Sequence, residues 1–217
     1  MKGEIEFEHV SFAYPEAGEN VLTDISFKAK KGQTIAVIGS TGSGKSTLIN
    51  LIPRYYDVTK GSVKVDGVDV RDMTQKELRD KLGYVPQKGV LFSGTIDSNI
   101  RYGKPEITDA QVKEAAEVAQ ATEFIDTKPE KYESPVSQGG TNVSGGQKQR
   151  LSIARAIAKD PEIFIFDDSF SALDFKTDSQ LRKALKEYTK DATTVIVAQR
   201  ISTILGADQI IVLDDGH

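Results

Sequence analysis

Apolar and charged residues alternate along the first part of the chain. Ile5 and Phe7 alternate with the charged residues Glu6 and Glu8, and Ile25, Phe27 and Ala29 repeat the same period of two. Such alternation is typical of strands with one face against a core and the other in water. We therefore predict that residues 4–35 are rich in β-structure.

Uninterrupted apolar runs further along the chain predict strands that are buried on both faces. These runs cover residues 34–38, 163–166, 193–198 and 209–213. Continuous apolar strands of this length are typical of a parallel sheet. Two shorter strands are predicted, one at 61–67 with a tight turn after which Val68 and Val70 continue, and one that ends at residues 84–87.

Helical signals occur after the first buried strand and dominate residues 95–159. Residues 46–52 predict a helix that Pro53 ends, and Thr74 with Glu77 forms a capping box for a short helix that Gly83 closes. Thr108 is predicted to cap a further helix, and Ser144 to cap one over residues 147–158. The apolar stripe after Thr108 consists of Val112, Ala115, Ala116 and Ala119, followed by Phe124 and Ile125.

Composition narrows the class of protein. The chain has 217 residues, a net charge of -4 and no cysteine, which excludes a disulfide framework and a cysteine-ligated metal site. The acidic balance argues against a nucleic-acid-binding module. No apolar run approaches the length of a membrane span, and the start lacks a signal peptide. We expect a soluble domain, and the strand and turn at its end suggest that it is cut from a longer polypeptide.

The stretch from Gly39 to Thr47 lies between a predicted strand and a predicted helix. Gly39, four residues, and then Gly44, Lys45 and Ser46 form the phosphate-binding loop pattern. Glycines let backbone N–H groups converge on phosphate oxygens, and the helix N-terminus adds partial positive charge. An incidental glycine-rich turn is the alternative, which the flanking strand and helix disfavour.

Other polar and aromatic residues occupy positions where chemistry is common. Tyr14 precedes the phosphate loop and could stack on a base, although most aromatic residues simply pack. Gln87 could contact Mg²⁺ or position water as a catalytic residue, or it could be a solvated loop residue. Ser144 could bind an anion or only cap its helix. Asp167 and Asp168 end a buried strand, where carboxylates can hold Mg²⁺ on phosphates.

These motifs together resemble the nucleotide-binding domain of an ATP-binding cassette (ABC) transporter. The phosphate loop is common to many NTPases, whereas the signature Ser144-Gly145-Gly146-Gln147 discriminates this family. The signature, Gln87, Asp167 and residues 171–174 all appear in family order. Residues 12–15 and 91–96 are most similar to the exporter branch, in which transmembrane helices precede this domain in the same polypeptide.

The resemblance implies an α/β fold, a P-loop NTPase with a RecA-like parallel-sheet core. An N-terminal antiparallel β subdomain and an inserted helical subdomain complete this fold. The ABC ATP-binding domain would span residues 1–217, with 1–87 and 160–217 forming the β subdomain and nucleotide-binding core. Residues 88–159 would form the helical signature subdomain, and a transmembrane domain is expected upstream.

The resemblance also implies ligands and roles. Adenine of ATP would stack on Tyr14. The phosphates and Mg²⁺ would be held by Gly39, Ser40, Thr41, Gly42, Ser43, Gly44, Lys45, Ser46 and Thr47. The Ser46 hydroxyl would coordinate Mg²⁺, Gln87 would approach the ion, and Asp167 would support it through water. Because two such domains enclose two ATP molecules head to tail, another group of residues would act on the partner's site. This group is Ser144, Gly145, Gly146, Gln147 and Asp174.

Two catalytic positions depart from the family pattern. A glutamate that polarises water is usual where this chain has Asp168, and the missing methylene withdraws the carboxylate by roughly 1.5 Å, which can cost on the order of 100-fold in rate. A histidine is usual where this chain has Gln199, which cannot carry positive charge. An acidic-basic pair is also common in exporters where Ser137 and Gln138 stand.

These departures resemble the degenerate-site half of a heterodimeric bacterial exporter. We expect an ABC-type ATPase that binds Mg-ATP, hydrolyses it weakly at its own site and completes the site of a different partner chain through its signature. An ordinary homodimeric ATPase with a slow aspartate base is the alternative. A nucleic-acid-associated ATPase fits the acidic balance poorly, and the signature excludes a P-loop kinase. The full transporter would place the domain on the cytoplasmic side of the cell membrane.

Overall fold

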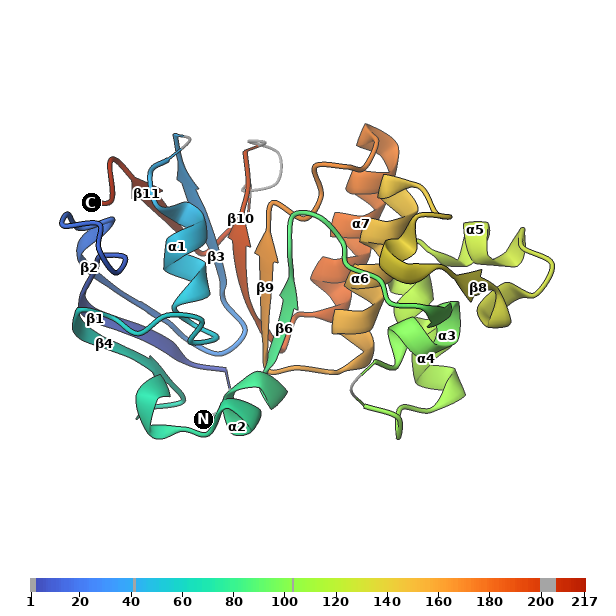
Figure 1. Ribbon diagram of the computed structural model, residues 1–217, viewed down its shortest axis with the longest axis horizontal. Coiled ribbons are helices and arrows are strands. Elements are labelled where there is room, and N and C mark those ends of the chain that lie inside the picture. The colour runs from blue at the N-terminus through green and yellow to red at the C-terminus, as the bar shows by residue number, and fades with distance from the viewer. Residues whose placement is uncertain (1–2, 41, 103, 200–205) are drawn as a thin grey trace. The chain divides into compact units, whose positions relative to one another are not determined.

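The computed structural model describes residues 3–40, 42–102, 104–199 and 206–217. By its contacts the chain forms two compact units (Figure 1). The first consists of Met1–Leu82, Glu162–Asp167 and Lys190–His217, and the second of Gly83–Pro161 and Asp168–Thr189.

The first unit contains the antiparallel sheet that the alternating pattern predicts. Its strand order is β2-β1-β4-β5, with bounds β1 (Ile5–Phe12), β2 (Leu22–Ala29), β4 (Lys60–Val65) and β5 (Val68–Asp69). Ile5 and Phe7 are buried, and Phe7 stacks on Phe27 of the neighbouring strand with ring centroids 4.6 Å apart. The period of two therefore correctly identifies the face that packs.

A parallel sheet in the same unit contains the apolar runs. Its neighbouring strands are β11 (Gln209–Leu213), β3 (Thr34–Gly39), β10 (Thr193–Val197) and β9 (Ile163–Asp167). The expectation of burial on both faces is wrong for residues 209–213, where Ile210 and Val212 are 50% and 61% exposed. Val197 lies opposite both Val37 and Asp167, so β3, β9 and β10 end at one edge of the sheet. The loop after Gly39, the carboxylate of Asp167 and the segment after Val197 consequently start from that edge.

Short helical elements complete the first unit. They are α1 (Lys45–Asn50), which lies next to β3 in Figure 1, the 3-10 turn η1 (Val70–Asp72) and α2 (Gln75–Asp80). Strand β6 (Leu82–Val85) starts at Leu82, the last residue of the segment Met1–Leu82 of this unit. The capping box of Thr74 and Glu77 is confirmed.

Three expected boundaries in this region are wrong. Helix α1 ends at Asn50, because residues 51 and 52 are buried in a turn and carry the apolar pattern beyond the helix. Gly83 does not close α2, which ends at Asp80 with Lys81 as its C-cap in right-handed helical conformation, and Gly83 instead lies in β6. Val70 begins the turn η1 and does not continue a strand.

The second unit is mostly helical. Its helices are α3 (Ile96–Ile100), α4 (Asp109–Val118), α5 (Thr122–Asp126), α6 (Gly145–Ala158) and α7 (Phe175–Tyr188), with 3-10 turns η2 (Lys131–Glu133) and η3 (Gln138–Gly140). Strands β7 (Gly94–Thr95) and β8 (Pro135–Val136) pair antiparallel. Capping boxes of Thr108 and Ser144 start α4 and α6 as expected.

Helix α7 is the longest element that the sequence analysis did not predict. It packs within the second unit, where α4 is one of its neighbours. Contacts therefore assign Asp168–Thr189 to the helical unit, whereas the expected division placed residues 160–217 with the core.

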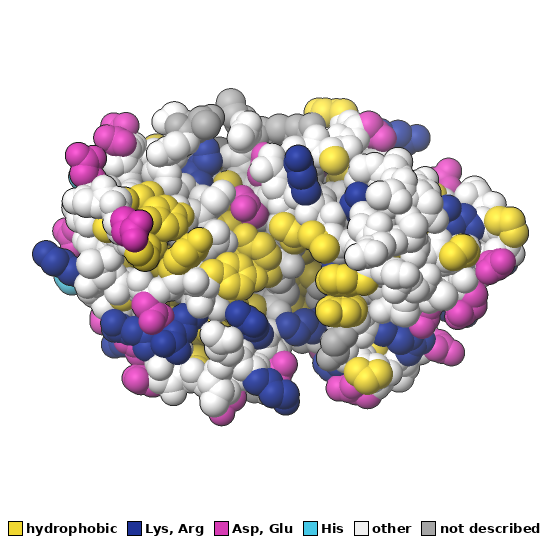
Figure 2. Space-filling view, in the orientation of Figure 1, with side chains coloured by type: hydrophobic (Ala, Val, Ile, Leu, Met, Phe, Trp, Pro, Cys, Tyr) yellow, Lys and Arg dark blue, Asp and Glu magenta, His cyan; other side chains and the backbone are white. Residues whose placement is uncertain are grey.

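Within the described ranges, no helix combines the length and the apolar character that crossing a bilayer requires. Lys and Arg side chains are interspersed with Asp and Glu over the face shown in Figure 2.

Candidate functional site

The predicted phosphate loop joins β3 to α1 in the first unit. Gly39 has a φ of 157° and Gly44, which precedes α1, has a φ of 98°. A Cβ atom on Gly39 would lie 2.5 Å from the Leu213 carbonyl oxygen, and one on Gly44 would lie 2.9 Å from Leu22. Both positions therefore require glycine. Gly42 also belongs to the described part of the loop, whereas Thr41 lies outside the described residues.

The polar side chains of this loop form a compact donor group. Lys45 donates through Nζ to the Gly39 carbonyl and, at 3.3 Å, to the Ser40 carbonyl. The Ser43 hydroxyl is buried and has no hydrogen-bond partner within the described chain. Ammonium, hydroxyl and loop amides are the groups that phosphate oxygens accept from. The loop thus has the chemistry of an anion site.

A hydroxyl and a carboxylate meet beside the loop. Ser46 Oγ donates to Asp167 Oδ1 at 3.3 Å, joining the start of α1 to the end of β9. These are hard oxygen ligands of the kind that Mg²⁺ prefers. No cluster of three or more acidic or histidine side chains suited to a metal exists among the described residues. Ser46 and Asp167 therefore fit a Mg²⁺ ion whose remaining ligands are phosphate oxygens and water.

Tyr14 lies in the loop after β1 and is half-buried. Its hydroxyl and the Thr47 hydroxyl are hydrogen-bonded at 2.7 Å, so the predicted base-stacking residue touches the first turn of α1. Phe12 and Tyr56 stand nearly perpendicular to its ring, at centroid distances of 4.9 and 5.2 Å. Sequence reasoning did not identify Tyr56.

Gln199 is exposed and follows β10 at the same sheet edge as the loop. It lies two residues after Val197, whose partner on β9 is Asp167. The register therefore brings this position to the side of the sheet from which the phosphate loop starts.

Gln87 and Asp168 belong to the second unit, where they contact each other. Gln87 Nε2 donates to Asp168 Oδ2 at 3.4 Å. Asp168 has a φ of 49°, a left-handed conformation that Asp tolerates better than most residues. Gln87 thus holds the carboxylate that the sequence analysis assigned as an aspartate base.

Two buried side chains that sequence reasoning missed fix the backbone on either side of this pair. Ser169 Oγ donates to the Val85 carbonyl at 2.6 Å, and Gln149 Nε2 donates to the Pro86 carbonyl at 3.0 Å. Both are almost fully buried. No motif or period marks them, because their role depends on which backbone carbonyls the fold places nearby.

The signature segment forms the start of α6. Ser144 Oγ accepts from the Gln147 N–H at 3.1 Å, and Gln147 Oε1 accepts from the Ser144 N–H at 3.3 Å. The cap uses the Ser144 oxygen as an acceptor, so its O–H remains a donor. Ser144 and Gly145 are exposed, and a Cβ on Gly145 would meet no atom within 4 Å. The anion and capping roles are therefore compatible.

Asp174 caps α7. Its carboxylate accepts from the Thr177 N–H at 2.7 Å and from the Thr177 hydroxyl at 3.0 Å. These hydrogen bonds lower the pKa of Asp174 below its ordinary value. The exposed side chain of Phe175 follows it.

An exposed aromatic surface lies elsewhere on the second unit. It is formed by the rings of Phe92 and Tyr102 together with the aliphatic Val90. The rings of Phe92 and Tyr102 stack at 4.3 Å, and the Arg155 guanidinium lies over both. Arg155 also donates to the carbonyls of Val90 and Asn99, and burial lowers its pKa. Although Arg155 contacts both rings, the Phe92 and Tyr102 residues are 40% and 58% exposed. Exposed aromatic groups of this kind are typical of protein interfaces.

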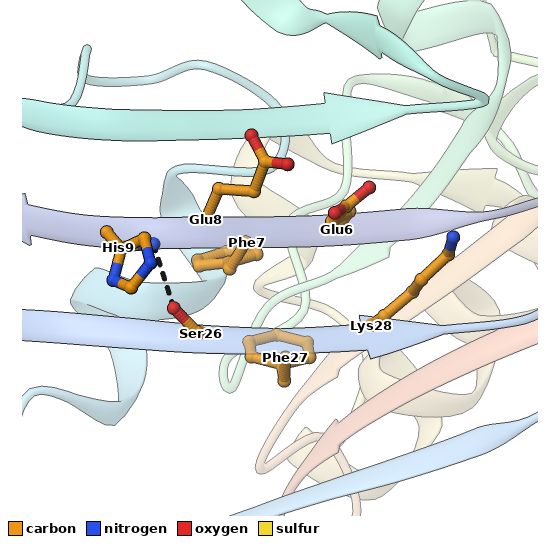
Figure 3. Close-up of a pocket in the computed structure, with 7 residues that line it drawn as sticks. All are labelled: Glu6, Phe7, Glu8, His9, Ser26, Phe27 and Lys28. Atoms are coloured by element: carbon orange, nitrogen blue, oxygen red, sulfur yellow. Dashed lines mark hydrogen bonds between the residues drawn. The ribbon is translucent and has the colours of Figure 1, made fainter.

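A surface hollow of about 560 Å³ lies on β1 and β2 (Figure 3). It is lined by Glu6, Phe7, Glu8, His9, Ser26, Phe27 and Lys28. None of these is a predicted site residue, and three of them are paired with neighbours: Glu8 with Lys64 at 3.3 Å, Lys28 with Glu4 at 3.3 Å and His9 with Asp24 at 2.8 Å. We assign it no function.

Similarity to known proteins extends over the whole chain. The family model described as "ABC transporter" matches residues 22–171. A Bacillus subtilis (strain 168) protein named as a multidrug export ATP-binding/permease protein is 47% identical over 216 residues, covering 100% of this chain and 37% of the relative. A Staphylococcus aureus (strain NCTC 8325 / PS 47) protein with the same description has the same identity and coverage.

A solved structure, described as a bacterial Atm1-family ABC exporter with ATP bound, has a TM-score of 0.94 and 39% identity. It covers 99% of this chain and 38% of its own chain. The chain thus spans less than two fifths of the length of the relatives that it matches.

Proposed function

The chain belongs to the ABC transporter family, and on this premise we propose that it is the Mg-ATP-binding domain of an exporter. Its partners would be a transmembrane domain of the same polypeptide and a second nucleotide-binding domain. It would work on the cytoplasmic side of the cell membrane. The relatives support this proposal, because each is named as a multidrug export protein that is both ATP-binding and a permease.

The donor group of the phosphate loop is the observation that carries ATP binding. Lys45 donates to two neutral carbonyls inside the loop, whereas phosphate oxygens would accept from its ammonium and also carry the opposite charge. Lys45 would therefore exchange these carbonyls for phosphate oxygens, and Ser43 would gain a partner. Ser46 and Asp167 would hold Mg²⁺, which neutralises charge on the phosphate oxygens when bound.

The aromatic surface of Val90, Phe92 and Tyr102 supports a membrane-domain partner. Arg155 and Asn99 hold these residues in place while leaving the rings accessible. A rigid aromatic surface favours contact with a protein segment because little side-chain entropy is lost on binding. We propose that a cytoplasmic segment of the transmembrane domain packs here, near Gln87 in the same unit.

The proposed ATP site of this chain is catalytically impaired. Asp168 is one methylene shorter than glutamate, and Gln199 cannot carry a positive charge. The shorter carboxylate of Asp168 would polarise the attacking water less effectively, and Gln199 would not supply a positive charge. Together these changes would leave the site able to bind ATP but slow to hydrolyse it. The signature is intact, and Ser144 retains a donor, so the chain would complete the hydrolytic site of a different partner domain.

An ordinary homodimeric ATPase is the second candidate. The hydrogen bond between Gln87 and Asp168 favours it, because an oriented carboxylate is what a working base requires. The two candidates differ in whether turnover needs a partner with glutamate and histidine at these positions.

ATP binding and steady-state hydrolysis should be measured for this chain alone and mixed with such a partner domain. The proposal expects binding with negligible turnover alone, and turnover in the mixture that is lost when Ser144 of this chain is replaced. Brisk turnover of the chain alone would refute the impaired site and leave the homodimeric ATPase. Absence of ATP binding would refute both.

A further inference from the structure

The loop that carries Tyr14 is tied to both ends of α1. The Tyr14 hydroxyl meets Thr47 in the first turn of α1 at 2.7 Å, and Thr47 is only 7% exposed. Tyr56, in the segment that follows α1, meets the ring of Tyr14 at 5.2 Å with an interplanar angle of 89°. The helix that starts at the phosphate loop therefore also sets the position of this ring.

Three aromatic rings form a closed cluster around this contact. Phe12 is buried at the end of β1 and touches both Tyr14 and Tyr56, at 4.9 and 5.5 Å. Neither neighbour is stacked parallel on Tyr14. Perpendicular aromatic pairs are favourable contacts, so they restrain the tilt of the Tyr14 ring, and neither pair is the parallel stack that a nucleobase would form.

The backbone around both tyrosines is also held. Ala17 N–H donates to the Tyr14 carbonyl at 3.0 Å, which closes a turn that contains Pro15. On the other side, Arg54 donates to both carboxylate oxygens of Asp57, at 2.7 and 3.3 Å, and so braces the segment that carries Tyr56. The ring cluster is thus a preformed arrangement between two restrained loops.

We propose that Tyr56 is a positioning residue for base recognition, which holds the Tyr14 ring ready to stack on the nucleobase of a nucleoside triphosphate. This inference rests on the proposed function, because it requires that the phosphate loop binds ATP. Tyr56 acts through Tyr14 and makes no contribution to the phosphates. It therefore affects ligands with a base and leaves ligands without one unchanged.

The test compares Mg-ATP with Mg-tripolyphosphate, which has the phosphates but no base, by calorimetric titration of this 217-residue chain. Tyr56→Leu should weaken ATP binding by about 3- to 10-fold, the effect of losing one aromatic pair, and leave tripolyphosphate binding within about twofold. Tyr56→Phe, the matched control, keeps the ring and should bind both ligands as the unmodified chain does.

A double substitution separates positioning from direct contact. Tyr14→Ala with Tyr56→Leu should bind ATP no more weakly than Tyr14→Ala alone, because Tyr56 acts only through the ring at position 14. Additive losses, equal weakening of both ligands, or unchanged ATP affinity in Tyr56→Leu would each overturn the inference. If the unmodified chain did not bind ATP, the proposed function would fail first, and this inference with it.

Discussion

Lengthening the Asp168 side chain by one methylene tests whether this carboxylate limits hydrolysis. In Asp168→Glu the carboxylate advances by about 1.5 Å with no change of charge. It would give up the 3.4 Å contact with Gln87 to approach the attacking water. Because a displacement of about 1 Å can change a rate by on the order of 100-fold, turnover at this site should rise by about that factor.

The assay must report only the site built on the phosphate loop of this chain. Phosphate release is therefore measured in a mixture with a partner domain whose own base has been removed. Asp168→Gln is the matched control, because it has the length of glutamate without a basic carboxylate. The left-handed backbone at residue 168, with φ of 49°, should cost the longer side chain less than about 1 kcal/mol of stability.

Two results would refute this reasoning. If Asp168→Glu binds ATP normally but hydrolyses it no faster, the aspartate is an adequate base and the site is not impaired. If Asp168→Gln gains as much as Asp168→Glu, side-chain length acts through packing and the carboxylate is not the base.

The remaining predictions concern other single side chains. Tyr14→Ala should weaken ATP binding by about 1 to 3 kcal/mol through lost base stacking, and an unchanged affinity in a titration would remove Tyr14 from the site. Ser144→Asp keeps the cap of α6, so the free energy of unfolding should stay within about 0.5 kcal/mol of that of the unmodified chain. Repulsion between the new carboxylate and phosphate should abolish turnover in the mixture, and retained turnover would contradict the signature role. Phe175 is 75% exposed at the start of α7 and should contact a partner domain. Phe175→Ser should therefore weaken ATP-dependent dimerisation about 10-fold or more in sedimentation experiments. A stable dimer without nucleotide would contradict the ATP-dependent assembly. Burial alone would raise the pKa of Asp66, but hydrogen bonds from Lys81 and from backbone N–H groups lower it below the ordinary 3.8. Its stabilisation is therefore present above that pH and lost as the pH falls through the folded-state pKa. Asp66→Asn should cost about 1 to 3 kcal/mol at pH 7 and flatten this acid dependence in urea titrations, and an unaltered slope would refute the assignment.

Local patterns were sufficient for elements whose stabilising contacts lie close in sequence. The cap of Ser144 uses an N–H three residues away, and the buried strands β3 and β9 are marked by consecutive apolar side chains. Helix α7 escaped prediction because only Leu181 and Leu185 form its buried apolar stripe, alongside a buried Asp178. Its N-cap, Asp174, was the available signal.

Contacts within the site depend on the tertiary fold and were not predictable. Tyr14 and Thr47 are 33 residues apart in sequence, and Gln87 and Asp168 are 81 apart. Motif spacing identifies which residue types are present, but it does not show that Gln87 donates to Asp168. For the same reason Tyr56 has no sequence signal, since its relevance arises only from its contact with Tyr14.

The closed turn after Tyr14 has a kinetic consequence for the proposed nucleotide site. The hydrogen bond from Ala17 and the fixed φ of Pro15 order this loop during folding, before any ligand arrives. A nucleotide that encounters an ordered ring needs no subsequent loop rearrangement. Association rates should therefore be similar for different nucleoside triphosphates, and the time that each remains bound should determine which one the domain prefers.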